Sequence, residues 1–191
     1  LNAGSSSIKF ATYREGEPVQ IEFRGRIEKI GIAPTLTVVD KAGEQIGQQS
    51  WPADGLDHRA ATKVILETIL RLLNGAAVAA VGHRVVHGGT EFDGPVLVTA
   101  EILTSLNRLS PLAPLHQPHN LAPVEAIREA APNLPQVACF DTAFHQSQPA
   151  LAQTFALPRE MTNSGTRRYG FHGLSYDFVS RRLAELAPDL A

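Results

Sequence analysis

The fold class depends most on the first thirteen residues, which read LNAGSSSIKFATY (1–13). An apolar start runs into a Gly/Ser turn, and strand-forming residues follow it, as in two strands joined by a tight turn. Further strand candidates follow, with glycine-containing turns between them, at 17–25, 35–39 and 45–51. The sheet should therefore begin with antiparallel strands, and the chain, which has no initial Met, is expected to start inside its first strand.

Helices and apolar strands alternate along the rest of the chain. Helical spacing of apolar residues predicts a helix that Asp57 caps and that Asn74 and Gly75 end. Further helices are expected at 99–109, 119–131 and 175–187, and buried strands at 76–81 and 136–140. Hairpins followed by such alternation predict a layered α/β or α+β domain.

Composition narrows the class of protein. The chain has 191 residues, 17 Lys+Arg against 19 Asp+Glu, and a net charge of -2, which argues against a nucleic-acid or membrane-surface binder. It has no apolar run of about 18 residues and no signal-peptide pattern, so no membrane partner is expected. A single cysteine, Cys139, excludes an internal disulfide and a cysteine zinc cluster and is typical of a reducing cytoplasm.

The turn that follows Asn2 is the first candidate site. Its small residues let backbone N–H groups approach an anion, while Ser5 and Ser7 add hydroxyls and Lys9 adds positive charge. It is not a Walker A loop, because the second glycine of that motif is absent and a strand follows in place of a helix. An ordinary hairpin turn is the alternative.

The second candidate site contains His83, Arg84 and His87. A zinc-binding helix is rejected, because Arg84 stands where metalloproteases have Glu and because two valines disfavour a helix. We expect a strand that presents Arg84 at its end, where the guanidinium fork can bind a carboxylate or a phosphate. The alternative is that Arg84 pairs only with a structural carboxylate.

A Pro-rich loop at 111–118 leads to His116 and His119. The H-x-x-H spacing occurs in metal sites, but Pro118 lies between the histidines and no third ligand is nearby. Capping of the next helix near Asn120 is the alternative.

Asp141 ends an apolar strand, and a buried carboxylate needs a cation, a metal or a functional reason. His172 lies in a glycine-flanked turn that can approach a ligand closely, whereas His145 is expected to support the site from outside or to lie at the surface. These hydroxyls, cations, imidazoles and the carboxylate favour phosphoryl transfer, whose catalysis depends on positioning and charge neutralisation.

Five ordered motifs resemble the acetate kinase family, within the acetate and sugar kinase/Hsp70/actin superfamily. They span nearly the whole chain and read NAGSSSIKF (2–10), HRVVHGG (83–89), PLAPLH (111–116), FDTAFH (140–145) and RYGFHG (168–173). The resemblance implies an α/β fold, a ribonuclease H-like (actin-like ATPase) domain with a mixed sheet flanked by helices. It also implies reversible phosphate transfer from ATP to acetate with Mg²⁺, which gives acetyl phosphate and ADP.

The resemblance also implies roles for single residues. Asn2 would help hold Mg²⁺, and Ser5, Ser7 and Lys9 would face the nucleotide phosphates. Arg84 would bind the carboxylate of acetate or acetyl phosphate, and Val86, Leu115 and Phe171 would line the pocket for the methyl group. Asp141 would be the essential carboxylate of the active site. His172 would stabilise the transferring phosphoryl group, and His116 would lie nearby.

Family members are much longer than this chain. Residues 1–191 are therefore expected to be an N-terminal domain without its nucleotide-binding C-terminal half, through which the whole protein would form a homodimer. The isolated domain should be weakly active or inactive. Leu174 and Tyr176 replace the family's usual Thr and His, and Gln117 replaces a common Asn, so substrate details stay open.

Three alternatives remain. A propionate or butyrate kinase would share the motifs, because one methylene changes discrimination by only about 1–3 kcal/mol. A non-catalytic anion-binding domain would bind phosphate through the turn at 5–9, called the serine turn below, without transferring it. A metal hydrolase would bind its metal through His83 with His87 or through His116 with His119. The kinase prediction requires Arg84, Asp141 and His172 to surround a common pocket.

Overall fold

The computed structural model describes residues 1–53 and 55–190. Its eight strands are β1 (Asn2–Ala3), β2 (Ser7–Arg14), β3 (Gln20–Glu28), β4 (Thr35–Asp40), β5 (Gln45–Ser50), β6 (Val81–Val85), β7 (Val96–Leu97) and β8 (Gln136–Phe140). Its α-helices are α1 (His58–Leu73), α2 (Ala100–Arg108), α3 (Gln117–Ala130), α4 (Ala150–Gln153), α5 (Arg159–Asn163) and α6 (Gly173–Leu186). Three single turns of 3₁₀-helix are η1 (Ser110–Leu112), η2 (Ala143–His145) and η3 (Pro188–Leu190).

The strands form one mixed sheet in the order β5-β4-β3-β2-β1-β6-β8-β7. The pairs from β1 to β5 are antiparallel, as the hairpins predict, whereas β1 pairs with β6, and β6 with β8, in parallel. A parallel pair needs a crossover connection, and α1 and then α2 and α3 lie in the two crossovers that lead to β6 and β8. The α/β alternative with a mixed sheet is therefore confirmed.

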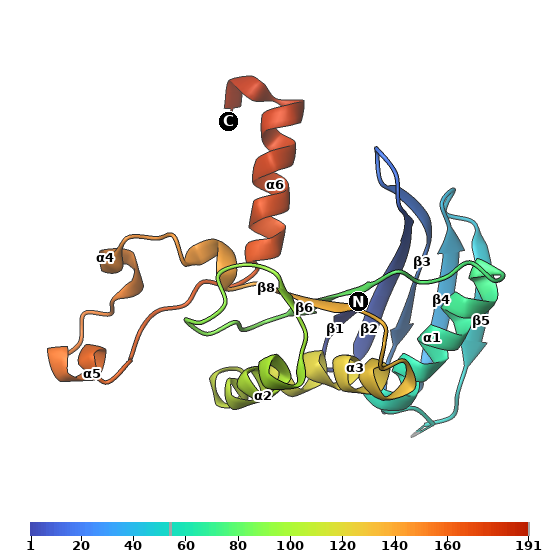
Figure 1. The fold of residues 1–191 in the computed structure, drawn as a ribbon, viewed down its shortest axis with the longest axis horizontal. Helices are drawn as coiled ribbons and strands as arrows, with labels where there is room; N and C mark the ends of the chain where they lie inside the picture. Colours follow the sequence, from blue (N-terminus) through green and yellow to red (C-terminus); the bar gives the residue numbers. More distant parts are fainter. Residues whose placement is uncertain (54, 191) are drawn as a thin grey trace.

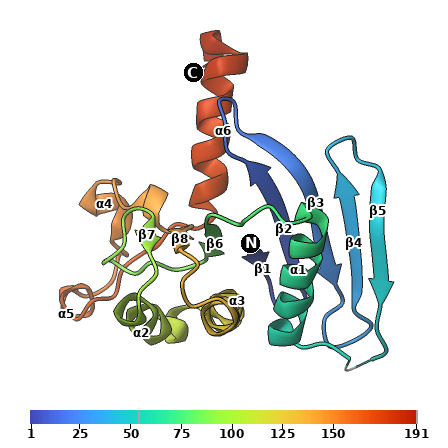
Figure 2. The same ribbon diagram turned by 45° about the vertical axis from the view of Figure 1, so that its right-hand side comes forward.

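Helices α1, α2 and α3 lie on one side of the sheet, and α6 rises from the other side (Figures 1 and 2). Two buried clusters join the sheet to these helices. The first packs α1 against β2, β3 and β4 and includes Ile8, Phe10, Ile27, Leu36, Val38, Ala61, Ile65 and Ile69. The second packs α2 and α3 against β6 and β8 and includes Val85, Leu103, Leu106, Leu121, Val124, Ala138 and Phe140.

The predicted cap of α1 is confirmed, and α2 has a cap of the same kind. The Asp57 carboxylate accepts a hydrogen bond from the backbone N–H of Ala60 (2.7 Å) at the start of α1. Asn74 ends that helix in the left-handed region, with φ 46°. Thr99 caps α2 through the N–H of Ile102 (3.3 Å). Such caps satisfy N–H groups that the first helical turn leaves without partners.

The predicted buried strand at 76–81 is wrong. Residues 76–80 have no regular structure and are mostly exposed, and pairing with β8 begins only at Val81. Four of those five residues are alanines, which bury little surface and have low strand propensity. Strand β3 begins at Gln20 instead of Glu17, since Pro18 has no N–H group to donate to a strand ladder.

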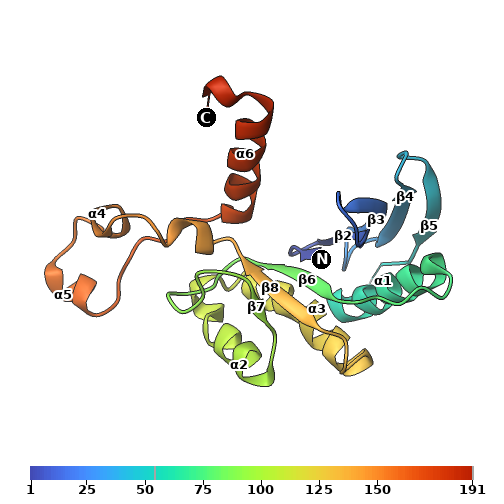
Figure 3. The same ribbon diagram turned by 45° about the horizontal axis from the view of Figure 1, so that its top comes forward.

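Beyond β8 the chain leaves the sheet through η2, α4 and α5 before it reaches α6 (Figure 3). Helix α6 presents several exposed apolar side chains, which are Tyr176, Phe178, Val179, Leu183 and Leu186. Within residues 1–53 and 55–190, no helix combines the length and apolar character that spanning a bilayer would demand.

Candidate active site

Three residues of the predicted site share one row across the sheet. Asn2 pairs in register with Arg84 on β6 and with Lys9 on β2, and Lys9 pairs with Arg26 on β3. Residues in register on neighbouring strands point to the same face of a sheet. The fold therefore places an amide and three cations together on the face opposite α1.

Arg84 binds two of the predicted residues directly. Its Nε donates to both carboxylate oxygens of Asp141 (3.2 and 3.0 Å), and Nη2 donates to Oδ2 of the same carboxylate (2.5 Å). Its Nη1 donates to Oδ1 of Asn2 (3.0 Å). A guanidinium carries about five N–H donors, so N–H groups of Nη1 and Nη2 are left for a further anion. Arg84 thus stands at a strand end as predicted, with a carboxylate partner.

Asp141 lies directly after β8 and is 1% exposed. Its backbone N–H donates to the carbonyl of Val85 (3.1 Å), so the turn after β8 is fixed against the end of β6. The predicted cation for this buried carboxylate is Arg84, whose side chain is 33% exposed. The pair is therefore buried on the carboxylate side and open on the guanidinium side.

The serine turn is held by its backbone. The N–H of Gly4 donates to the carbonyl of Ser7 (2.8 Å), and the carbonyl of Gly4 accepts from Nε2 of His58 (2.7 Å) at the start of α1. Ser5 is exposed and Ser7 is half-buried, while Lys9 is exposed on the following strand. The hydroxyls and the ammonium group are thus accessible to a ligand, while His58 of α1 fixes the backbone of the turn.

His172 lies in the turn that leads into α6 and has a φ of 58°, which is uncommon for a residue with a side chain. The next residue, Gly173, donates its N–H to the backbone carbonyl of Asp141 (2.9 Å). The His172 turn is therefore attached to the residue that binds Arg84. Enclosure of all three side chains in one pocket stays a prediction.

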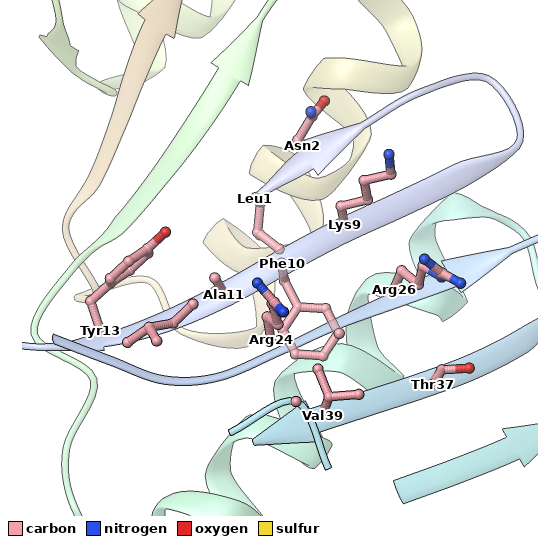
Figure 4. Close-up of a pocket in the computed structure, with 13 residues that line it drawn as sticks. Leu1, Asn2, Lys9, Phe10, Ala11, Tyr13, Arg24, Arg26, Thr37 and Val39 are labelled. Atoms are coloured by element: carbon pink, nitrogen blue, oxygen red, sulfur yellow. The ribbon is translucent and has the colours of Figure 1, made fainter. Parts of the chain in front are cut away.

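The residues expected in and near the methyl pocket are more exposed to solvent than Asp141. Leu115 is 72% exposed and Phe171 is 39% exposed, while Val86 is half-buried and His116 is exposed. A cavity of about 720 Å³ lies instead over β1 to β4, where Asn2 and Lys9 form part of its wall. Figure 4 shows the side chains of Asn2 and Lys9 on the same side of the β1–β2 hairpin. Neither the three residues expected to line the methyl pocket nor His116 lines this cavity.

Two amides of α3, absent from the predicted site, fix the segment that follows Arg84. Oδ1 of Asn120 accepts from the N–H of Val86 (2.7 Å), and its Nδ2 donates to the carbonyl of Ala3. Gln117 accepts from the N–H of His87 (3.2 Å) and donates to its carbonyl (3.1 Å). Asn120 thus connects β1 with the segment after β6, and Gln117 attaches the same segment to α3. The capping role considered for Asn120 is wrong, because α3 already begins at Gln117.

The histidines considered as metal ligands make other contacts. Nε2 of His83 binds Oε1 of Gln136 (2.8 Å), and Nδ1 of His87 accepts from the N–H of Gly89 (2.9 Å). His119 lies with its ring centroid 4.5 Å from that of His58. In the part of the chain that the structure describes, no group of three or more His, Cys, Asp or Glu residues could hold a metal ion.

The buried His83 makes stability depend on pH. Burial, with a smaller effect of the neighbouring terminal amine, lowers the pKa of His83 from 6.5 to about 4. The unfolded chain therefore binds a proton that the folded chain does not, so stability is full above pH 6.5 and falls as the pH decreases toward about 4. Between pH 7 and pH 4.5, the protonation of His83 in the unfolded chain should decrease the free energy of unfolding by roughly 2–3 kcal/mol.

Urea unfolding of the protein at pH 7 and pH 4.5 measures this loss. The H83Q variant keeps a partner for Gln136 without a titrating ring, so its loss between the two pH values should be smaller by that amount. Equal losses in the two proteins would contradict the prediction.

The chain was compared with known proteins by sequence and by structure. The sequence model of the acetokinase family matches residues 1–189. Acetate kinases of Rhodopseudomonas palustris (strain ATCC BAA-98 / CGA009) and Rhizobium meliloti are 48% and 44% identical to this chain. Each alignment covers 98% of this chain and 48% of the relative, so the chain spans about half the length of the curated relatives it matches.

Solved structures show the same fold. Porphyromonas gingivalis acetate kinase aligns with a TM-score of 0.84 at 37% identity, over 97% of this chain and 47% of that one. A propionate kinase from Francisella tularensis subsp. tularensis SCHU S4 aligns with a TM-score of 0.85 at 32% identity, over the same shares. The expected ribonuclease H-like, actin-like ATPase fold is confirmed. The chain belongs to the acetokinase family.

Proposed function

We propose that this chain is the N-terminal half of an ATP-dependent acetate kinase, which transfers a phosphate reversibly from ATP to acetate. The observation that carries the proposal is the contact of Arg84 with both Asp141 and Asn2, where three neighbouring strands meet. A cation, a carboxylate and an amide oxygen thus lie beside an open serine turn in a chain of the acetokinase family. Phosphoryl transfer depends on such positioning and neutralisation of charge.

The nucleotide end of the site is proposed at the serine turn. Ser5, Ser7 and Lys9 would contact the phosphates of ATP, since the turn is open and Lys9 shares a face with Asn2. Mg²⁺ takes oxygen ligands and is commonly held by one or two side chains together with phosphates. The side-chain oxygens of Asn2 and Asp141, which both accept hydrogen bonds from Arg84, fit that pattern. When bound, Mg²⁺ would neutralise charge on the phosphates.

The acyl end is proposed at Arg84. The N–H groups that its contacts leave over would bind the carboxylate of acetate, while Asp141 fixes the orientation of the guanidinium. A carboxyl group has a pKa of about 4, so acetate is already ionised at pH 7 and needs no general base. We therefore propose Asp141 as an orienting and metal-binding group. The methyl group would contact Val86, Leu115 and Phe171, with His116 nearby.

The transfer step is proposed to be direct and in line. An acetate oxygen attacks the γ-phosphorus of ATP, the bond from phosphorus to the bridging oxygen breaks, and ADP leaves with the electron pair. His172, in the turn attached to Asp141, would donate to the transferring phosphoryl group as charge spreads over its oxygens.

Steady-state phosphorylation of acetate, propionate and butyrate tests the proposal. The whole protein, meaning this chain with the second half that its relatives carry, should prefer acetate. The 191-residue chain alone should form acetyl phosphate at least about 10²-fold more slowly, because half of the groups that position the substrates are missing. Robust activity of the chain alone would contradict the two-half proposal, and inactivity of the whole protein on all three acids would contradict a carboxylate kinase.

A propionate kinase is the second candidate function. The propionate kinase structure aligns as well as the acetate kinase structure, with TM-scores of 0.85 and 0.84. A higher kcat/KM for propionate than for acetate would select it.

The organisation of the whole protein is also a proposal. The coverage of 48% of each relative supports a second, nucleotide-binding half, and we propose that this half forms a homodimer interface and that the enzyme is cytoplasmic. Light scattering of the whole protein and of the 191-residue chain should give a dimer and a monomer, respectively.

A further inference from the structure

The His172 turn needs support from outside itself. A φ of 58° places a residue with a Cβ in the left-handed region, which is unfavourable and persists only where the surroundings determine it. The His172 side chain is exposed, so its own packing does not fix the turn. The contacts of its two neighbours, Phe171 and Gly173, must do so.

Both neighbours are held by the segment that directly follows β8. Gly173 donates its N–H to the carbonyl of Asp141 (2.9 Å), and the carbonyl of Phe171 lies 2.9 Å from Nε2 of His145. Because a carbonyl only accepts, Nε2 of His145 carries the proton and donates it. One hydrogen bond therefore fixes the backbone on each side of His172.

The ring of His145 also fits the turn sterically. A Cβ on Gly170 would overlap Cγ and Nδ1 of that ring, so only glycine leaves room for it there. On its other sides the ring meets Phe144 edge-on (centroids 5.3 Å apart) and Tyr176 edge-on (5.6 Å), and Phe144 stacks on Tyr176 (6.0 Å). Tyr176 lies in the first turn of α6, so the ring is fixed to the helix that starts directly after His172.

We propose that His145 is a positioning residue, which acts through the carbonyl of Phe171 to aim the His172 imidazole toward the site of Arg84 and Asp141. The proposal rests on the proposed function, in which His172 stabilises the transferring phosphoryl group. His145 makes no contact with substrate in this role, so its effect on catalysis must pass through His172.

A double-mutant cycle in the whole protein tests this route. H145A should lower kcat by about 10–100-fold while the KM values for ATP and acetate change less than about 3-fold. In the H172A background the same change should cost less than about 2-fold, because there is no imidazole left to aim. H145Q, which keeps an N–H donor, should recover most of the activity, and S147A, an exposed neighbour, should keep full activity.

A structural readout accompanies the kinetics. Amide hydrogen exchange at Gly173, whose N–H is bonded to Asp141, should become faster in H145A while exchange in β6 and β8 stays unchanged. G170A, which displaces the ring without removing it, should reproduce both effects and serves if H145A does not fold.

The outcomes separate this inference from the proposed function. Equal losses from H145A in both backgrounds, or unchanged exchange at Gly173, would overturn the positioning role. A wild-type protein that phosphorylates no carboxylate, but whose Gly173 amide is released in H145A, would overturn the proposed function and leave the support of the turn by His145 established.

Discussion

R84A in the whole protein should lower kcat/KM for acetate by about 10³-fold or more. Two observed contacts are lost, those of Arg84 with Asp141 and with Asn2, together with the proposed contact between its remaining N–H groups and the substrate carboxylate. A buried carboxylate without its cation is also costly, so the free energy of unfolding should decrease by roughly 3 kcal/mol. Steady-state kinetics and urea unfolding measure the two effects.

Two variants separate catalysis from folding. R84K keeps one positive charge but lacks the planar fork, so it should restore much of the stability and little of the activity. R14A removes an exposed arginine that pairs with Glu22 at 2.7 Å and should change neither quantity measurably. An R84A protein within 10-fold of wild-type kcat/KM would rule out Arg84 as the acyl-binding group.

The positions of Arg84 and Asp141 were predictable because Asp141 directly follows an apolar strand, and because the valines around Arg84 favour a strand over a helix. Parallel strands bring such ends to one edge of a sheet, and β6 and β8 are indeed adjacent. The expectation that the buried carboxylate needs a cation was likewise confirmed by the ion pair. Local sequence therefore predicted that Arg84 and Asp141 meet, because strand ends and buried charges follow general rules.

The contacts of α3 were not predictable in the same way. Gln117 and Asn120 look like ordinary polar residues at a helix start, yet both are buried and bind backbone groups far away in the chain. Their partners depend on how α3 packs against β1 and β6, which no local pattern contains. The prediction of a strand over the alanine-rich stretch at 76–80 was wrong for a related reason, since only pairing with β8 decides where β6 begins.

G173A should lower kcat by about 10²-fold or more, although this residue has no side chain to contact a substrate. A Cβ there would overlap the backbone carbonyl of Asp141 and lie 2.6 Å from Cβ of Phe144. Neither atom belongs to a flexible side-chain end, so α6 and the His172 turn must move away from the end of β8. Overpacking of this kind costs roughly 1–3 kcal/mol of stability, which thermal unfolding would record.

Gly82 provides the matched control. It lies in β6, two residues before Arg84, and a Cβ there would meet nothing within 4 Å. G82A should therefore keep the kcat and unfolding temperature of the wild type. If G173A also kept its kcat within about 2-fold, a displacement of the His172 turn would have no catalytic effect, and the attachment of that turn to Asp141 would be irrelevant to phosphoryl transfer. A loss in G173A alone would show that the reaction depends on the close approach of two backbone segments, which the glycine permits.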